Sequence, residues 1–126
     1  MRIDHIALFT EDIERLQAFY CAYFGGVAGG RYHNPRTGLS TCFISFSDGA
    51  RLEIMARPDV AAKPQRAQLG YAHIAFYAGS RAAVDALTER LRAGGYEIES
   101  GPRVTGDGYY ESCALDPDGN VVEITG

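Results

Sequence analysis

Several features that would assign the chain to a broad protein class are missing from its sequence. The 126 residues carry a formal net charge of -4 and no dense run of Lys or Arg, which argues against nucleic acid as a partner. No stretch of about 18 apolar residues occurs, and the N-terminal segment MRIDHIALFTEDIER has acidic residues where a secretion signal needs an apolar core. We therefore expect no membrane partner and a cytoplasmic location.

Cysteine is also scarce. Cys21, Cys42 and Cys113 are odd in number and have no CxxC spacing, so they predict neither a disulfide framework nor a zinc knuckle. We expect three reduced thiols, buried as free cysteines usually are. The length and the 46% hydrophobic content suit one compact domain with one core.

The sequence contains an internal repeat. The first half opens with IDHIALF at 3–9 and ends with SFSDGARLEIM at 45–55. The second half opens with YAHIAFY at 71–77 and ends with LDPDGNVVEIT at 115–125. A Gly-Gly pair lies between the two landmarks of each half. The two halves are therefore expected to fold alike.

Apolar periodicity predicts the order β-α-β-β-β in each half. The opening apolar segment is a strand, and residues at helical spacing follow it. Thr10 and Ser80 are the expected N-caps, and the Gly-Gly pairs at 25–26 and 94–95 are the expected helix ends. The last two strands of each half flank an Asp-Gly turn, which predicts a hairpin. The further expected strands are 27–33, 41–46 and 51–55 in the first half, and 96–100, 109–115 and 121–125 in the second.

These elements predict an α+β fold made of two βαβββ modules. Module one covers residues 1–56 and module two covers 71–126. The connector at 57–70 contains Pro58 and Pro64 and has little periodicity. Together the modules form a single domain over residues 1–126.

Strand alternation places four ionisable residues on one face of the sheets. The apolar neighbours of His5, Glu53, His73 and Glu123 would pack against the helices, so these four side chains point to the other, concave side. A lone His on a strand is more often a hydrogen-bonded structural residue than a ligand, and a lone Glu near a strand end is usually solvated. The repetition of one His and one Glu in both halves favours metal binding over these structural roles. Two imidazoles and two carboxylates suit one ion of Zn²⁺, Ni²⁺, Co²⁺, Mn²⁺ or Fe²⁺. His33 has no counterpart in the repeat and is expected at the surface or in a lid.

These motifs resemble the vicinal oxygen chelate superfamily. The resemblance rests on DHIAL at 4–8, RLEI at 51–54, YAHIAF at 71–76 and VVEI at 121–124, and it covers essentially the whole chain. That superfamily includes glyoxalase I, fosfomycin-resistance thiol transferases, methylmalonyl-CoA epimerases, extradiol dioxygenases and bleomycin-binding proteins. The resemblance implies a partly open β-barrel-like metal cavity with the helices outside. It also implies paired modules from one chain or from the two chains of a homodimer.

The order His, Glu, His, Glu is similar to that of glyoxalase I, whereas the dioxygenases use two His and one carboxylate. The resemblance implies a divalent-metal-dependent lyase or isomerase that acts on a small oxygen-chelating substrate through a metal-stabilised enediolate. Glu123 matches the glutamate to which the family assigns proton transfer, so it is the expected catalytic base as well as a ligand. A thiol transferase or an epimerase of the same superfamily, or a non-catalytic protein that sequesters a small molecule, are the alternatives.

Face alternation across the hairpins extends the predicted cavity beyond the ligands. A departure from glyoxalase I concerns the position four residues after the first His, where a glutathione-binding arginine is common and this chain has Phe9. Glutathione is therefore not the expected substrate group. The residues expected to line the substrate cavity are Phe9, Thr41, Phe43, Tyr109, Glu111 and Cys113.

Overall fold

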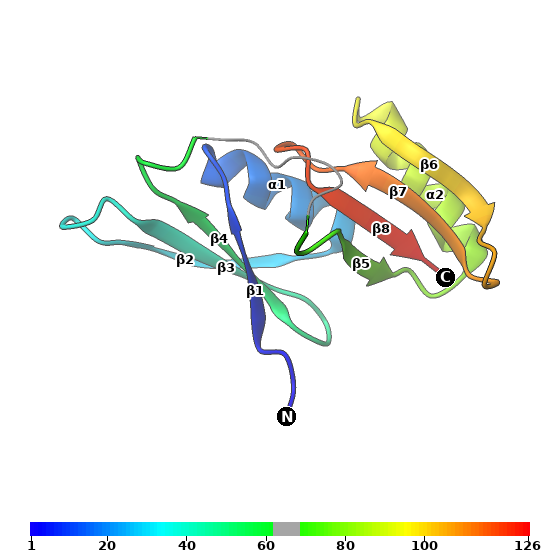
Figure 1. Ribbon diagram of the computed structural model, residues 1–126, viewed down its shortest axis with the longest axis horizontal. Coiled ribbons are helices and arrows are strands. Elements are labelled where there is room, and N and C mark those ends of the chain that lie inside the picture. The colour runs from blue at the N-terminus through cyan, green and yellow to red at the C-terminus, as the bar shows by residue number, and fades with distance from the viewer. Residues whose placement is uncertain (62–68) are drawn as a thin grey trace. The chain divides into compact units, whose positions relative to one another are not determined.

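The computed structural model describes residues 1–61 and 69–126 (Figure 1). Two compact units divide the chain, Met1–Ala62 and Lys63–Gly126. Residues 62–68 of the connector predicted at 57–70, including Pro64, lie outside the described residues. The single domain over 1–126 and its module boundaries stay predictions.

Each unit has the predicted β-α-β-β-β order, which confirms the α+β fold. The predicted strands 27–33 and 121–125 have the observed bounds. Most other ends differ by one or two residues, as helix and strand ends commonly do. The first unit contains β1 (His5–Phe9), α1 (Ile13–Phe24), β2 (Val27–His33), β3 (Ser40–Ser45) and β4 (Arg51–Ala56). The second contains β5 (Ile74–Tyr77), α2 (Arg81–Ala93), β6 (Ile98–Val104), β7 (Tyr110–Leu115) and β8 (Val121–Thr125).

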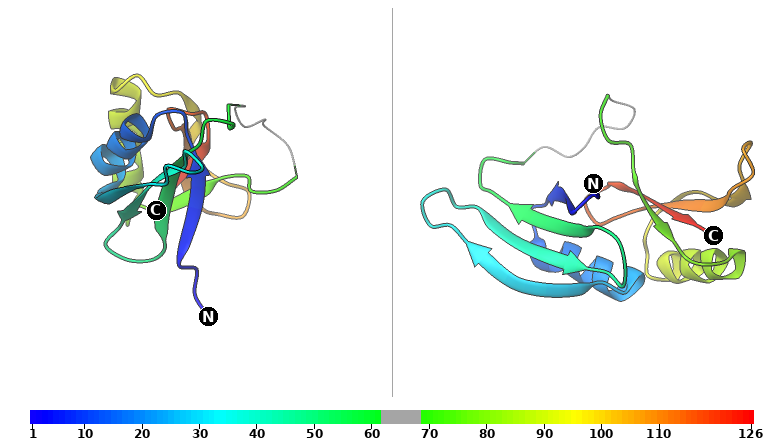
Figure 2. Two further views of the ribbon diagram at one scale, coloured as in Figure 1. Left: turned by 90° about the vertical axis from the view of Figure 1, so that its left-hand side faces the viewer. Right: turned by 90° about the horizontal axis from the view of Figure 1, so that it is seen from below.

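The sheet topology of each unit places its first strand beside its last. The strand orders are β1-β4-β3-β2 and β5-β8-β7-β6. Pairing is parallel between β1 and β4 and between β5 and β8, and antiparallel elsewhere. Within each unit the helix packs on one face of its own sheet (Figure 2). The parallel pair therefore carries His5 and Glu53 on neighbouring strands in the first unit, and in the second unit Glu123 lies on the strand that pairs with β5.

Alternation along the strands separates a buried face from an open face, as predicted. Leu52 and Ile54 are buried on either side of Glu53, and Val122 and Ile124 are buried on either side of Glu123. These side chains face the helices, whose buried residues include Leu16 and Leu91. Burial of a Val, Leu or Ile side chain contributes roughly 1.5–3 kcal/mol. The core therefore determines which face carries the Glu residues. The fully buried large side chains are Tyr20, Phe19, Leu16, Ile44, Ile54, Leu91, Ile124, Val84 and Val122.

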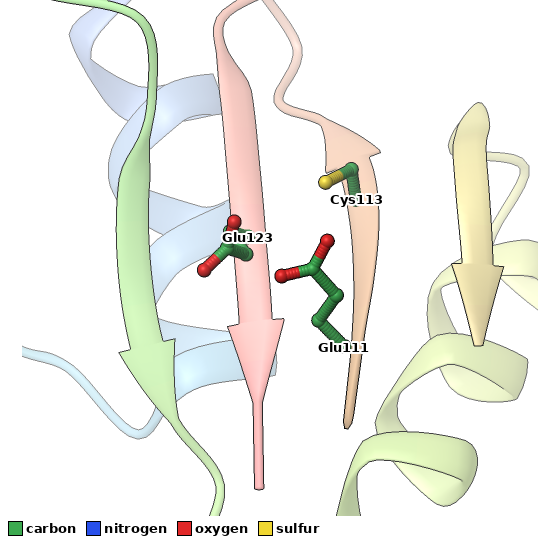
Figure 3. A group of neighbouring side chains, drawn as sticks. All are labelled: Glu111, Cys113 and Glu123. Carbon is green, nitrogen blue, oxygen red and sulfur yellow. The ribbon is translucent and has the colours of Figure 1, made fainter. Parts of the chain in front are cut away.

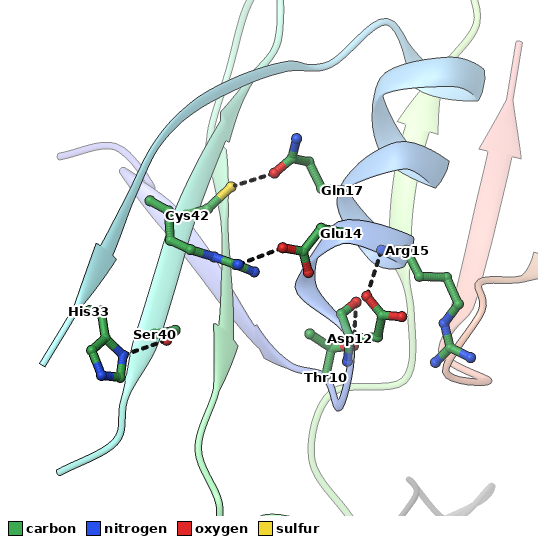
Figure 4. A network of polar contacts seen from close by, with 9 residues as sticks. Thr10, Asp12, Glu14, Arg15, Gln17, His33, Ser40 and Cys42 are labelled. Atoms are coloured by element: carbon green, nitrogen blue, oxygen red, sulfur yellow. Dashed lines mark hydrogen bonds and ion pairs between the residues drawn. The ribbon is translucent and has the colours of Figure 1, made fainter. Parts of the chain in front are cut away.

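The start of α1 corrects one prediction. Asp12, not Thr10, is the N-cap, and its Oδ1 accepts a hydrogen bond from the Arg15 amide at 2.9 Å (Figure 4). Thr10 still belongs to the strand ladder, because its amide donates to the Met55 carbonyl at 2.8 Å. Its buried hydroxyl accepts from the Asp12 amide at 3.0 Å. Thr10 thus supports the cap rather than forming it.

The other helix signals agree with the structure. Ser80 is the N-cap of α2, and its Oγ accepts from the Ala83 amide at 3.2 Å. Gly25 ends α1 in the left-handed conformation, with φ of 68°, which glycine adopts at little cost. Neither helix in the described residues has the length and apolar character needed to cross a membrane.

Two strand predictions were displaced. β5 begins at Ile74, which pairs with Val122, so His73 immediately precedes the strand rather than lying in it. β6 covers Ile98–Val104 instead of 96–100, and its pairing with β7 has two register shifts. Such irregular pairing disrupts the alternation from which a strand can be recognised.

Candidate metal centre

The first unit joins His5 and Glu53 across the parallel β1–β4 pair. The His5 Nε2 atom lies 3.6 Å from Glu53 Oε2. The Glu53 side chain is 19% exposed, so its carboxylate is largely withdrawn from water. Phe43, the β3 partner of Glu53, makes an edge contact with the His5 ring at 5.3 Å between centroids. Arg51 lies over the Phe43 ring at 4.4 Å. The Phe43 ring therefore supports the His5 imidazole through this edge contact.

The second unit repeats this pair with His73 and Glu123. The distance from His73 Nε2 to Glu123 Oε2 is again 3.6 Å. The Glu123 side chain is 18% exposed, close to the value for Glu53. The sequence repeat thus extends to the atoms of the site.

Asp4 distinguishes the first pair from the second. The His5 Nδ1–H donates to Asp4 Oδ2 at 2.9 Å, and the Arg51 guanidinium donates to the same oxygen at 2.6 Å. These contacts, led by the hydrogen bond from His5, lower the pKa of Asp4 to about 2, so the carboxyl is ionised at neutral pH. An ionised acceptor at Nδ1 selects the tautomer whose Nε2 lone pair is free, as in many metal-binding histidines. The residue before His73 is Ala72, so the second imidazole lacks this support.

Glu123 is also close to two groups on the neighbouring strand. Cys113 is its register partner, and Glu111 lies two positions earlier on β7. Donor atoms of the three residues all lie within 4.8 Å of one another (Figure 3). Glu111 is 9% exposed, and its Oε1 accepts a hydrogen bond from Arg103 at 3.2 Å. In module one the positions that correspond to Glu111 and Cys113 in strand register are Thr41 and Phe43. The acidic and thiol groups beside Glu123 therefore have no equivalent beside Glu53.

Burial and neighbouring charge change the acid–base properties of this cluster. Burial raises the pKa of Glu123, and the charge of Glu111 raises it further. Burial likewise raises the pKa of the Cys113 thiol, which keeps it protonated at neutral pH in the absence of a metal. Glu123 is therefore a stronger base than a solvated glutamate.

The predicted substrate-lining residues occupy different places in the two units. Phe43 and Cys113 lie beside the predicted ligands as register partners, and Thr41, 8% exposed, pairs with Met55. Phe9 is 41% exposed at the end of β1. Tyr109, 63% exposed, precedes β7. Tyr109 is thus the least enclosed of these residues.

Three residues outside the predicted ligand set clarify the surroundings. Asp4 was not predicted, although an acidic residue directly before the first His was a visible signal. Arg57 was also missed, and its guanidinium lies 5.6 Å from the Phe9 ring centroid while donating to Asp59 at 2.6 Å. His33 is exposed, as predicted, and its Nδ1 is 2.9 Å from Ser40 Oγ (Figure 4).

The thiols agree in part with their prediction. All three cysteines are free, but only Cys42 is buried, while Cys21 and Cys113 are half-buried. Each unit by itself offers donors that suit a divalent cation, one imidazole nitrogen and one shielded carboxylate, and Asp4 orients the imidazole of the first unit.

Comparisons with known proteins agree with this fold and repeat. The family model described as the Glyoxalase/Bleomycin resistance protein/Dioxygenase superfamily matches residues 2–124. The uncharacterized protein YqjT of Bacillus subtilis (strain 168) is 30% identical over 125 residues, which cover 95% of this chain and 94% of YqjT.

Two solved structures extend the comparison. The structure of lactoylglutathione lyase from Agrobacterium tumefaciens has a TM-score of 0.69 and 26% identity, covering 98% of this chain and 91% of that one. The trypanothione-dependent glyoxalase I of Leishmania major has a TM-score of 0.80 and 21% identity, covering 99% and 86%, and shows a similar fold. The superfamily resemblance read from the repeat motifs is confirmed, and the chain belongs to the glyoxalase/bleomycin resistance protein/dioxygenase superfamily.

Proposed function

We propose that this protein is a divalent-metal-dependent lyase or isomerase for a small substrate with two adjacent oxygen atoms. His5, Glu53, His73 and Glu123 would hold the ion. The observation that carries the proposal is the repeated His–Glu pair, with 3.6 Å between Nε2 and Oε2 in each unit. Neither pair alone supplies the three or more protein donors that a catalytic zinc site usually has, so a pair from each module is needed. The pairs would come from one chain or from the two chains of a homodimer.

Glu123 is the residue that would move the proton. Its raised pKa brings the carboxyl closer to neutral pH, where a general base is most effective. When bound, a divalent ion would supply Lewis-acid stabilisation of negative charge on the substrate oxygens. Glu123 would accept a proton from one carbon and return it to the next. Asp4 would hold the His5 ring in place throughout.

The end of β1 supports a substrate other than a glutathione adduct. Phe9 provides an apolar ring where glyoxalase I commonly has an arginine. Arg57 approaches that ring, but its charge is already matched by Asp59 at 2.6 Å. A charge-assisted hydrogen bond contributes about 1.5–3 kcal/mol, so its loss weakens recognition roughly ten- to a hundredfold. We therefore expect weak or no turnover of the methylglyoxal–glutathione hemithioacetal.

Metal content of the purified protein tests the ligand set. We expect a stoichiometric divalent ion in the wild type, its loss in Glu123→Ala and a lower metal content in His5→Ala, since each removes a ligand from a different unit. His33→Ala is the matched control, because it removes an exposed imidazole outside both pairs. Unchanged metal content in His5→Ala and Glu123→Ala would refute the site. Chelation should also lower the melting temperature, because a ligand that binds only the folded state stabilises it.

Turnover assays test the reaction separately. Any lyase or isomerase activity should require Glu123 and be lost in Glu123→Gln. Efficient turnover of the hemithioacetal, with kcat/KM of about 10⁴ M⁻¹s⁻¹ or more, would refute the expectation based on Phe9. A metal-loaded protein that binds but converts no substrate in a screen of small carbonyl and thiol compounds would favour the sequestering alternative. The cytoplasmic location and the dimer stay predictions from the sequence.

A further inference from the structure

Module two contains two donors, Glu111 and Cys113, that the proposed four-residue site does not use. Glu111 and Cys113 lie on β7 and point toward Glu123 on β8, with all three donor atoms within 4.8 Å (Figure 3). His73 Nε2 is 3.6 Å from Glu123 Oε2. These residues belong to one unit, so the geometry of the group is complete without module one.

The spacing suits a single ion. Metal–sulfur and metal–oxygen bonds are about 2.3 Å and 2.0–2.2 Å long, so two donors of one tetrahedral ion are about 3.4–3.6 Å apart. Donors that already lie within 4.8 Å need only small side-chain rotations to reach this arrangement. The strand pairing between Cys113 and Glu123 limits how far they can separate.

The chemistry of the group differs from that of a solvated acidic patch. Glu111 is 9% exposed and the Glu123 side chain is 18% exposed, so both carboxylates are withdrawn from water. Arg103 forms an ion pair with Glu111 at 3.2 Å and so compensates one of the two carboxylate charges. The thiol adds a soft donor, which favours Zn²⁺ or Co²⁺ over Mn²⁺ or Mg²⁺.

We propose that Glu111, Cys113 and Glu123 form a second cation site, selective for thiophilic divalent ions and confined to module two. The Cys113 thiol gives its proton to solvent when the sulfur binds. Module one has no such site, because Thr41 and Phe43 occupy the register-matched positions. The two sites share Glu123. An ion held by Cys113 therefore withdraws the carboxylate proposed as the base and inhibits the enzyme, a consequence that rests on the proposed function.

Cobalt spectroscopy of the full-length protein distinguishes the two sites. Co²⁺ alone is titrated onto metal-free wild type, Cys113→Ser, Cys21→Ser and His5→Ala. A bound thiolate gives an intense charge-transfer band in the near ultraviolet, which nitrogen and oxygen ligands do not give. We expect this band in the wild type, in Cys21→Ser, where the thiol is equally half-buried, and in His5→Ala. The band should be lost in Cys113→Ser.

Zinc provides an independent measurement on the wild type. Zn²⁺ should protect Cys113, and not Cys21, from alkylation, as read by mass spectrometry of the peptides. This measurement needs no variant to fold.

The outcomes separate the inference from the proposed function. Stoichiometric Co²⁺ without a charge-transfer band, or a band that survives in Cys113→Ser, would overturn the second site and leave the four-residue site standing. A band in the wild type and in His5→Ala, together with no Co²⁺ binding at all in Cys113→Ser, would support the second site and overturn the four-residue one. No binding of Co²⁺ or Zn²⁺ by the wild type would overturn both.

Discussion

Replacing Asp4 with alanine should weaken metal binding through His5 without removing a ligand. Asp4 Oδ2 accepts from His5 Nδ1 at 2.9 Å and from Arg51 at 2.6 Å. Without this acceptor the proton can occupy either ring nitrogen, and the imidazole, which is 39% exposed, can rotate away from Glu53. Loss of such a supporting carboxylate typically weakens metal binding by about ten- to a hundredfold. We expect that loss here, because Asp4 controls both the tautomer and the orientation of the ring.

Asp59→Ala is the matched control for this experiment. Asp59 is also an exposed carboxylate paired with an arginine at 2.6 Å in the same unit, but it accepts this hydrogen bond from Arg57 and not from a histidine. Exposed ion pairs contribute little to stability, so both metal-free variants should melt close to the wild type. Affinity is measured by competition against a chelating dye. Equal affinity in Asp4→Ala and Asp59→Ala would refute the reasoning.

Two further variants test the surroundings of Glu123 in metal-free protein. The folded-state pKa of Glu123 is raised above 4.5, so ionisation of this carboxyl destabilises the folded state once the pH rises past about 4.5. Glu123→Gln should therefore melt higher than the wild type at pH 7, and the difference should vanish as the pH falls to about 4.5. Melting curves across a pH series measure this, and a pH-independent difference would contradict it. Gly101→Ala should lower the free energy of unfolding by at least about 1–2 kcal/mol, because φ is 82° and an added Cβ would lie 2.5 Å from the Glu111 carbonyl oxygen. Gly106→Ala, with nothing within 4 Å of the added atom, should change it by less than about 0.5 kcal/mol in the same urea titration, and equal effects of the two substitutions would refute the steric argument.

The order of helices and strands and the open face that carries Glu53 and Glu123 could be predicted from the sequence because both follow from periodicity. Alternating apolar residues around Glu53 and Glu123 determine which face is buried, and the repeat relates one pair to the other. Thr10 was assigned wrongly because residue type alone does not show that its amide stays in the strand ladder. A cap preference cannot distinguish Thr10 from Asp12 when both are suitable residues.

The parts of the site that were missed depend on contacts between distant segments. The Asp4 carboxylate that accepts from His5 is also held by Arg51, which only the parallel pairing of β1 with β4 brings near it. Glu111 and Cys113 were predicted only as substrate-lining residues, since the closeness of their donor atoms to Glu123 depends on side-chain rotamers as well as on register. Strand alternation gives the face of a residue but not the distance between two side-chain atoms.

The parallel pairing of first and last strands has a consequence for how the protein folds. His5 and Glu53 lie near opposite ends of their unit, as do His73 and Glu123, so each pair meets only when the whole unit has closed. The chain loses entropy when such a long loop closes, before the contacts between the two strands can stabilise it. Strand pairings of this kind therefore form slowly. A nascent or partly unfolded chain therefore presents its histidines and glutamates singly. Each pair becomes available to a cation only in a unit whose first and last strands have joined, so capture of the ion would report completed folding.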